Sequence, residues 1–158
     1  AIDDHAVYMM WPDQTPLNSG IEYYTREFPD TQDGACFVDA GCERILTFNH
    51  AIRANAVYEV YYESHKVWRW ITLEDGRRAV VAFNWFSDSW PTTNGHEGHL
   101  WQSYEVDVWL EVPEGVWRYY AGYSESDIVD GEDLVLGTVR SATQTRYETE
   151  EEAAGGEL

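Results

Sequence analysis

Lysine is almost missing from this chain, and that near-absence excludes one large class of partner. Lys66 is the only lysine among 10 basic residues, and 29 acidic residues bring the formal net charge to −19. Nucleic-acid binding needs clustered Lys and Arg to meet phosphates, so we expect no DNA or RNA partner. A dense acidic surface with so little lysine is typical of high-salt environments, where screening shortens to about 3 Å in molar salt.

Long apolar runs are missing as well. No segment approaches the roughly 18 consecutive apolar residues of a membrane helix, and the first residues lack the basic-then-apolar pattern of a signal peptide. We therefore expect a chain without a transmembrane segment. Asn-x-Ser/Thr sequons are also absent, so the sequence offers no standard site for an N-linked glycan.

Cysteine is limited to Cys36 and Cys42, six positions apart, with Gly41 able to form a tight bend. A local disulfide between them would stabilise the fold by about 2 kcal/mol in the chain-entropy model. Two free buried thiols are an equally acceptable reading. A zinc site is disfavoured, because the chain has no second Cys or Cys/His pair with matching spacing.

Helical periodicity is not evident over any useful length, whereas alternation of apolar and polar residues recurs along the chain. An Asp75-Gly76 pair between two alternating runs predicts a tight hairpin. Residues Ser87 to Gly98 read as a loop. The predicted strands are Ala6–Trp11, Ile21–Phe28, Ala35–Val38, Arg44–His50, Ala54–Ser64, Val67–Leu73, Arg78–Phe86, Tyr104–Val112, Val116–Tyr123, Leu134–Val139 and Thr143–Tyr147.

The clearest predicted hairpin joins Tyr104–Val112 to Val116–Tyr123 through Pro113, Glu114 and Gly115. Proline fixes the turn's φ angle, and Gly115 is expected in a left-handed conformation that penalises a side chain. Residues of the first strand alternate, which predicts one buried and one wet face. The buried face is expected to carry Tyr104, Val106, Val108, Leu110 and Val112, and the wet face Glu105, Asp107, Trp109 and Glu111.

Many short strands separated by Gly, Pro, Asn and Asp turns, without interleaved helices, predict an all-β fold. We expect a single-domain β-sandwich, jelly-roll-like in its connections, with long loops. Its length bounds the chain to one domain, which we assign to residues 1–147. Residues 148–158 form an acidic tail with no apolar pattern, expected to be disordered in the isolated chain.

Aromatic residues are abundant, with 8 Trp, 11 Tyr and 5 Phe. Flat rings on a sheet can bind sugar rings, but large rigid aromatics also fill cores and subunit interfaces, and we favour the second reading. The tryptophans that could serve as glycan platform or interface are Trp68, Trp70, Trp101, Trp109 and Trp117.

One histidine-rich segment contains residues that could bind a metal ion. His96, Glu97 and His99 lie within four residues between glycines, but their spacing differs from that of helical zinc motifs, so a surface loop is favoured. Nothing resembles a nucleophile elbow, a phosphate loop or a Cys/His pair with an orienting acid. The sequence therefore predicts neither a catalytic residue nor a cofactor, and we expect no enzyme.

Acidity, aromatic content and the strand-rich portion from about Ala54 to Arg140 together resemble a known kind of protein. They are similar to the single jelly-roll capsid proteins of haloarchaeal icosahedral viruses and to the β-sandwich decoration proteins of haloarchaeal tailed viruses. The resemblance implies a structural virion subunit that assembles in many copies with itself and with other virion or surface proteins. It implies a virion or cell-surface location in high salt, and no cofactor.

Two alternatives stay open. The first is a secreted or cell-surface carbohydrate-binding β-sandwich module that uses the tryptophans named above. The second is a metal-dependent enzyme that uses His96, Glu97 and His99.

Overall fold

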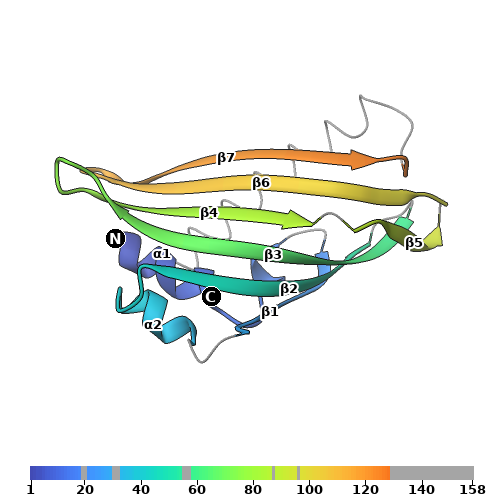
Figure 1. The fold of residues 1–158 in the computed structure, drawn as a ribbon, viewed down its shortest axis with the longest axis horizontal. Coiled ribbons are helices and arrows are strands. Elements are labelled where there is room, and N and C mark those ends of the chain that lie inside the picture. The colour runs from blue at the N-terminus through green and yellow to red at the C-terminus, as the bar shows by residue number, and fades with distance from the viewer. Residues whose placement is uncertain (19–20, 30–32, 55–57, 87, 96, 129–158) are drawn as a thin grey trace.

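A computed structural model describes residues 1–18, 21–29, 33–54, 58–86, 88–95 and 97–128. These residues form two short α-helices, one 3₁₀ turn and seven strands (Figure 1). In chain order the elements are α1 (Ile2–Met9), η1 (Thr15–Leu17), β1 (Ile21–Glu27), α2 (Gly34–Val38), β2 (Arg44–Ala54), β3 (Tyr58–Thr72), β4 (Arg78–Phe86), β5 (Trp90–Gly95), β6 (His99–Val112) and β7 (Gly115–Ser126).

All described strands belong to one antiparallel sheet, which confirms the all-β prediction. The strands run across the sheet in the order β1, β2, β3, β4, β6, β7. Strand β5 pairs with both β3 and β6 and so occupies the position of β4 beyond the end of that strand. A second sheet, which a jelly roll would have, is not among the described residues. The predicted strands Leu134–Val139 and Thr143–Tyr147, and the boundary at residue 147 with the acidic tail, lie outside them.

Both predicted hairpins are confirmed. At Asp75-Gly76 the amide of Leu73 donates to the carbonyl of Arg77 at 2.8 Å, and Gly76 has a φ of +86°. At the β6–β7 turn, Val112 pairs with Gly115, whose φ is +146°. Glycine is needed at both turns because L side chains rarely adopt these angles.

Two predicted strands are wrong: Ala6–Trp11 belongs largely to helix α1, and Ala35–Val38 lies within helix α2. Both helices are only a few residues long, too short for a helical period to stand out. Local signals nevertheless favour them, because acidic Asp3 and Asp4 occupy the first turn of α1 and the Asp33 side chain accepts the Cys36 amide at the start of α2.

Several boundaries also differ from prediction, since β2 continues to Ala54 and β6 begins at His99. The runs Ala54–Ser64 and Val67–Leu73 form one continuous strand, β3, because the alternation continues through His65 and Lys66. The predicted loop Ser87–Gly98 contains strand β5, whose pairing with β3 and β6 could not be read from local sequence.

The helices cover one face of the sheet near the end where the β3–β4 and β6–β7 turns lie (Figure 1). We call this side of the sheet the covered face and the other the open face. The core residues on the covered face are Ile45, Trp68, Trp70, Val80, Ala82 and Trp109, packed against Ile2, Ala6, Tyr8, Met9, Leu17 and Phe37. A bidentate contact from Arg78 to Asp3, at 2.7 Å for both bonds, fastens α1 to β4.

Strand β6 alternates as predicted, but the face that was predicted to be exposed is the buried one. Asp107 and Trp109, predicted on the wet face, lie on the covered face and are each 1% exposed. The valines and leucine that were predicted to be buried lie on the open face and are half-buried, while Tyr104 is exposed. Burial of Asp107 is possible because Lys66 and Arg118 neutralise its charge.

Candidate functional site

The open face carries a row of rings that crosses five strands. Phe48, His65, Trp85, Tyr104 and Tyr123 are successive cross-strand partners on β2, β3, β4, β6 and β7. Ring centroids are 4.5 Å apart for Phe48 and His65, and 5.4 Å apart for His65 and Trp85. We call these five residues the ring row.

A second row lies beside the ring row, toward the β3–β4 and β6–β7 turns. Its members are also successive cross-strand partners: Leu46, Val67, Phe83, Val106 and Ala121. Apart from Phe83 these side chains are aliphatic and smaller than those of the ring row, so we call them the aliphatic row. Phe83 stacks on both Trp85 and Tyr104, at centroid distances of 5.3 and 6.4 Å.

Further apolar side chains extend the open face toward the turns. The large exposed ones on this part of the face are Ile71, Phe83, Trp117 and Tyr119, with 36%, 41%, 55% and 48% of their surface accessible. In the described part of β2 to β7, the two rows contain no carboxylate, and the next row along holds Arg44 and Arg69. On a chain of net charge −19, this apolar surface without acidic groups makes the open face the candidate site.

At the other border of the ring row, acidic groups surround His50. Its Nδ1 lies 3.3 Å from Glu63 and its Nε2 3.6 Å from Glu27. Tyr61 donates to the Glu63 carboxylate, and this hydrogen bond raises the pKa of Tyr61 to about 12. A groove here is lined by Glu27, His50 and Glu63 and also by His65, Trp85 and Asp88. The groove therefore gives the open face one acidic end.

The tryptophans proposed from sequence fall into two groups. Trp68, Trp70 and Trp109 are buried on the covered face, so they are core residues and cannot form a glycan platform. Trp101 and Trp117 are exposed, at 41% and 55%. Sequence reasoning missed the ring row, because alternation assigns each residue to a face of its strand but does not give the cross-strand register that brings the rings together.

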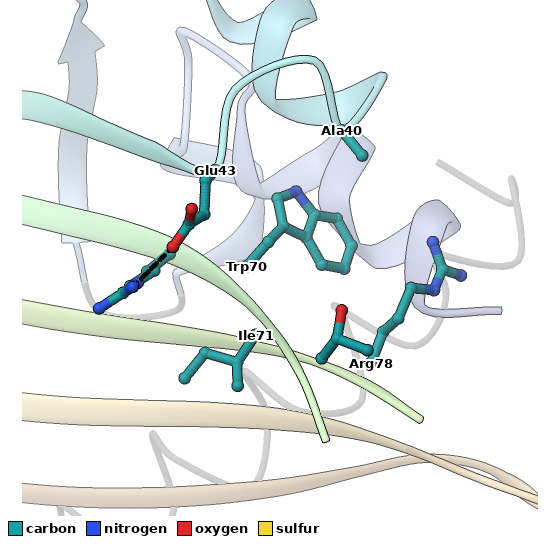
Figure 2. Close-up of a pocket in the computed structure, with 7 residues that line it drawn as sticks. Ala40, Glu43, Trp70, Ile71 and Arg78 are labelled. Carbon is teal, nitrogen blue, oxygen red and sulfur yellow. Dashed lines mark hydrogen bonds and ion pairs between the residues drawn. The ribbon is translucent and has the colours of Figure 1, made fainter. Parts of the chain in front are cut away.

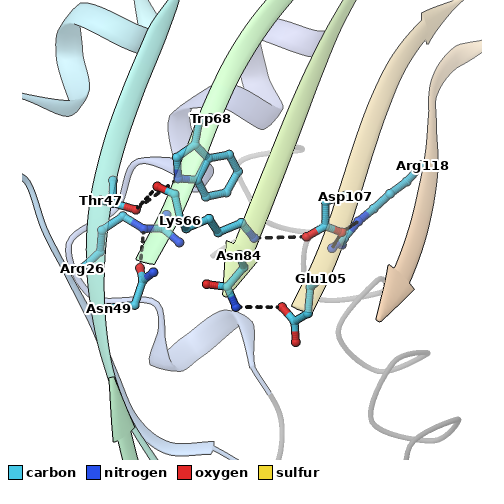
Figure 3. A network of polar contacts seen from close by, with 9 residues as sticks. All are labelled: Arg26, Thr47, Asn49, Lys66, Trp68, Asn84, Glu105, Asp107 and Arg118. Atoms are coloured by element: carbon cyan, nitrogen blue, oxygen red, sulfur yellow. Dashed lines mark hydrogen bonds and ion pairs between the residues drawn. The ribbon is translucent and has the colours of Figure 1, made fainter. Parts of the chain in front are cut away.

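A network of charged residues lies on the covered face beside the core (Figure 3). Lys66 donates to Asp107 at 3.1 Å, and Arg118 donates to the other oxygen of that carboxylate at 2.6 Å. Lys66 also lies 4.3 Å from the centre of the Trp68 ring, and Arg118 lies 4.6 Å from that of Trp109. The only lysine in the chain is therefore 2% exposed and is held by a carboxylate and two aromatic rings.

Polar contacts continue along the network toward β1. The Arg26 side chain donates to Asn49 at 3.0 Å, and Asn84 donates to Glu105 at 3.0 Å (Figure 3). These residues come from β1, β2, β4 and β6, so the network ties strands across most of the sheet. Because Lys66, Asp107 and Arg118 pair with one another, we assign the network a structural role.

The hollow beside Trp70 is a third candidate (Figure 2). It is lined by Ala40, Glu43, Arg69, Trp70, Ile71, Thr72 and Arg78. Arg69 is paired with Glu43 at 2.6 Å, and Arg78 with Asp3, so its charged groups already have partners. The Trp70 ring is stacked on Phe37 and donates to that residue's carbonyl, which fixes it as part of the core.

The predicted metal segment is only partly described, because His96 lies outside the described residues. The His99 ring is stacked on Trp101 with centroids 4.7 Å apart, and Glu97 is exposed. Within the described ranges, no cluster of His, Cys, Asp or Glu could hold a metal ion. Cys36 and Cys42 are free thiols, and burial raises the pKa of Cys42 to about 12, helped by its hydrogen bond with Cys36.

Comparisons with protein-family models, curated proteins and solved structures return no match to this chain. Neither of the described helices has the length and apolarity needed to cross a bilayer.

Proposed function

We propose that this protein is a structural subunit that acts through contacts between copies, as a capsid or capsid-decoration protein of a halophilic archaeal virus. The open face carries the proposal. It presents two rows of rings and aliphatic side chains on an antiparallel sheet, with no described helix or strand packed on them. Apolar sheet faces are stable when another sheet covers them about 10 Å away.

The residues at the functional surface support assembly more than catalysis. Exposed Trp and Tyr are enriched at protein interfaces, where rigid rings bury much surface at low entropic cost. The charged groups that the structure buries, such as Lys66 and Asp107, are paired with one another beneath the other face. The proposal also includes jelly-roll connections between the strands, a virion or cell-surface location in high salt, and contacts with other virion or surface proteins.

Sedimentation velocity in molar KCl tests self-assembly. We expect the protein to form a defined oligomer at micromolar concentration, and replacement of Trp117 and Tyr119 by Ala to shift it toward the monomer. Val7→Ala is the matched control, since Val7 is 47% exposed on helix α1, away from the open face. A wild-type protein that stays monomeric at every concentration would contradict the proposal.

A carbohydrate-binding module is the second candidate, because a flat row of exposed rings can also stack on sugars. In that case the wild-type protein would be retained on a polysaccharide column as a monomer, and Trp117→Ala would release it. Assembly predicts no retention together with an oligomer, so the two functions give opposite results in the same pair of measurements.

A further inference from the structure

We infer that a second copy of this chain packs on the open face, with a two-fold axis that crosses the strands at the level of Lys66. This inference rests on the proposed function and specifies its contact surface. It follows from the register of the sheet, which fixes what each open-face residue would meet on an identical partner.

Strand β3 of one copy would lie over strand β3 of the other. A two-fold axis in the interface, perpendicular to the strands at Lys66, places residues equally far before and after that position opposite each other. Val67 then meets the partner's His65, Arg69 meets the partner's Glu63, and Ile71 meets the partner's Tyr61. One opposite-charge pair and two apolar contacts result, each formed twice because the interface is isologous.

On β2, β3, β6 and β7 the same axis places a ring opposite an aliphatic side chain, while on β4 Phe83 meets the partner's Trp85, ring against ring. Thr47, Asn84 and Glu105 lie at the level of Lys66 or next to it in the register, so the axis separates the ring row from the aliphatic row on every strand. The ring row of each copy therefore lies over the aliphatic row of the other. Bulky rings facing smaller side chains give the interdigitation that packed sheets require.

Charge distribution favours this axis over the other face-to-face choice. Arg44 and Arg69 pair directly across β2 and β3 at one end of the face, while Glu27 and Glu63 flank His50 at the other. An axis across the strands brings the basic end of each copy over the acidic end of its partner. An axis along the strands would instead keep the basic ends at the same level and place β2 and β3 over β6 and β7.

The area is adequate for a stable dimer. With strands about 4.8 Å apart and a rise of about 3.4 Å per residue, the face from β2 to β7 and from Tyr61 to Ile71, the span that lies evenly about Lys66, measures roughly 24 by 34 Å. Its flat footprint of about 800 Å² matches the area of about 800 Å² that a standard interface buries on each partner. Arg69 pairs with Glu43 of its own chain at 2.6 Å, but that pair is exposed, at 59% and 67%, so Arg69 can exchange Glu43 for the partner's Glu63 at little cost.

Charge reversal tests the axis. Arg69→Glu and Glu63→Arg each place like charges opposite one another twice, so each should raise the dimer dissociation constant at least tenfold. The double variant restores opposite charges at both positions and should return the constant to within about threefold of wild type. Arg77→Glu, at an exposed pair with Asp75 in the β3–β4 turn, is the control and should leave the constant unchanged.

Analytical ultracentrifugation at the lowest salt that preserves the folded circular-dichroism signal is the measurement, because molar salt would screen the pairs. Ala121→Trp supplies a steric test, since Ala121 is exposed and would face the partner's Tyr123; we expect it to weaken the dimer without lowering the melting temperature. The axis is wrong if neither single reversal changes the dimer dissociation constant, or if the double variant does not restore it. Either outcome would still be compatible with assembly of copies through another contact. A wild type that stays monomeric in molar KCl as well overturns the proposed function itself.

Discussion

At the scale of single residues, the most informative one is Asp107, because it decides which side of β6 is buried. Its carboxylate accepts hydrogen bonds from Lys66 and Arg118, and all three side chains are at most 10% exposed. A buried charge is tolerated only when it is paired. Because of this pairing, the face of β6 that carries Asp107 can be buried, although its acidic residues predict an exposed face.

Asp107→Asn should therefore destabilise the fold strongly. The change keeps the shape of the side chain but leaves Lys66 and Arg118 without their shared carboxylate, and loss of one partner in a buried ion pair costs about 3–5 kcal/mol. Urea unfolding at constant salt measures it. Asp75→Asn, at an exposed pair with Arg77, is the control and should cost less than about 1 kcal/mol; equal effects of the two changes would show that Asp107 is not a buried partner.

At the scale of elements, helix α1 and the β6–β7 turn each depend on a few contacts. Helix α1 is held by apolar packing and by the bidentate bond between Asp3 and Arg78. The turn depends on Gly115, whose backbone conformation excludes most side chains although a Cβ there would meet no atom within 4 Å. The cost of a substitution at Gly115 is therefore backbone strain alone.

Gly115→Val should destabilise the domain by about 1–2 kcal/mol or more, because a branched side chain is strained at positive φ. Glu114→Ala, one residue earlier in the same exposed turn, should change stability by less than about 0.5 kcal/mol. Denaturant midpoints of the two variants decide the matter. If the midpoints are the same, the turn does not need glycine at this position.

The contact between Asp3 and Arg78 should make the stability dependent on pH. The Arg78 hydrogen bonds lower the pKa of Asp3 below its usual value of 3.8, so this carboxylate stabilises the folded state above that value. The contribution is lost as the pH falls through the lower folded-state pKa. Because the Asp3 side chain is 49% exposed, the contribution should be at most about 1 kcal/mol.

Asp3→Asn is the variant that isolates this contribution. The difference in unfolding free energy between wild type and variant should be present at pH 7 and should shrink as the pH falls below about 4. Urea titrations at a series of pH values measure it. A difference that stays constant with pH would mean that the carboxylate charge does not fasten α1 to β4.

At the scale of the whole molecule, folding and association both depend on the balance between repulsion of the surface charges and burial of the apolar open face. A net charge of −19 repels itself at low salt and also repels a second copy. Salt screens that repulsion while the apolar rows remain available, so high salt should favour both folding and association.

The melting temperature should accordingly rise with salt. Thermal melts followed by circular dichroism, from millimolar to molar KCl at a fixed low protein concentration, measure the effect on the fold itself. A midpoint that does not change with salt would contradict the high-salt assignment.

The sequence by itself was sufficient for the local features of this protein. Alternation predicted β1, β2, β4 and the β6–β7 hairpin, and turn chemistry predicted glycine at positive φ in the β6–β7 turn. Composition indicated an acidic surface, and from that charge follows the expectation of no nucleic-acid partner. These features depend on neighbouring residues or on sums over the chain, which is why they could be predicted without the fold.

Only the tertiary structure decided which face of each strand is buried. Alternation shows that a strand has two faces, but Asp107 and Trp109 are buried because Lys66, 41 positions away, and Arg118, on the neighbouring strand, supply the opposite charge. The ring row likewise exists only through the register of five strands, since its members are 17 to 20 positions apart from one ring to the next. Helices α1 and α2 form because they cover the apolar side that this register creates, and short segments carry too little periodicity to indicate it alone.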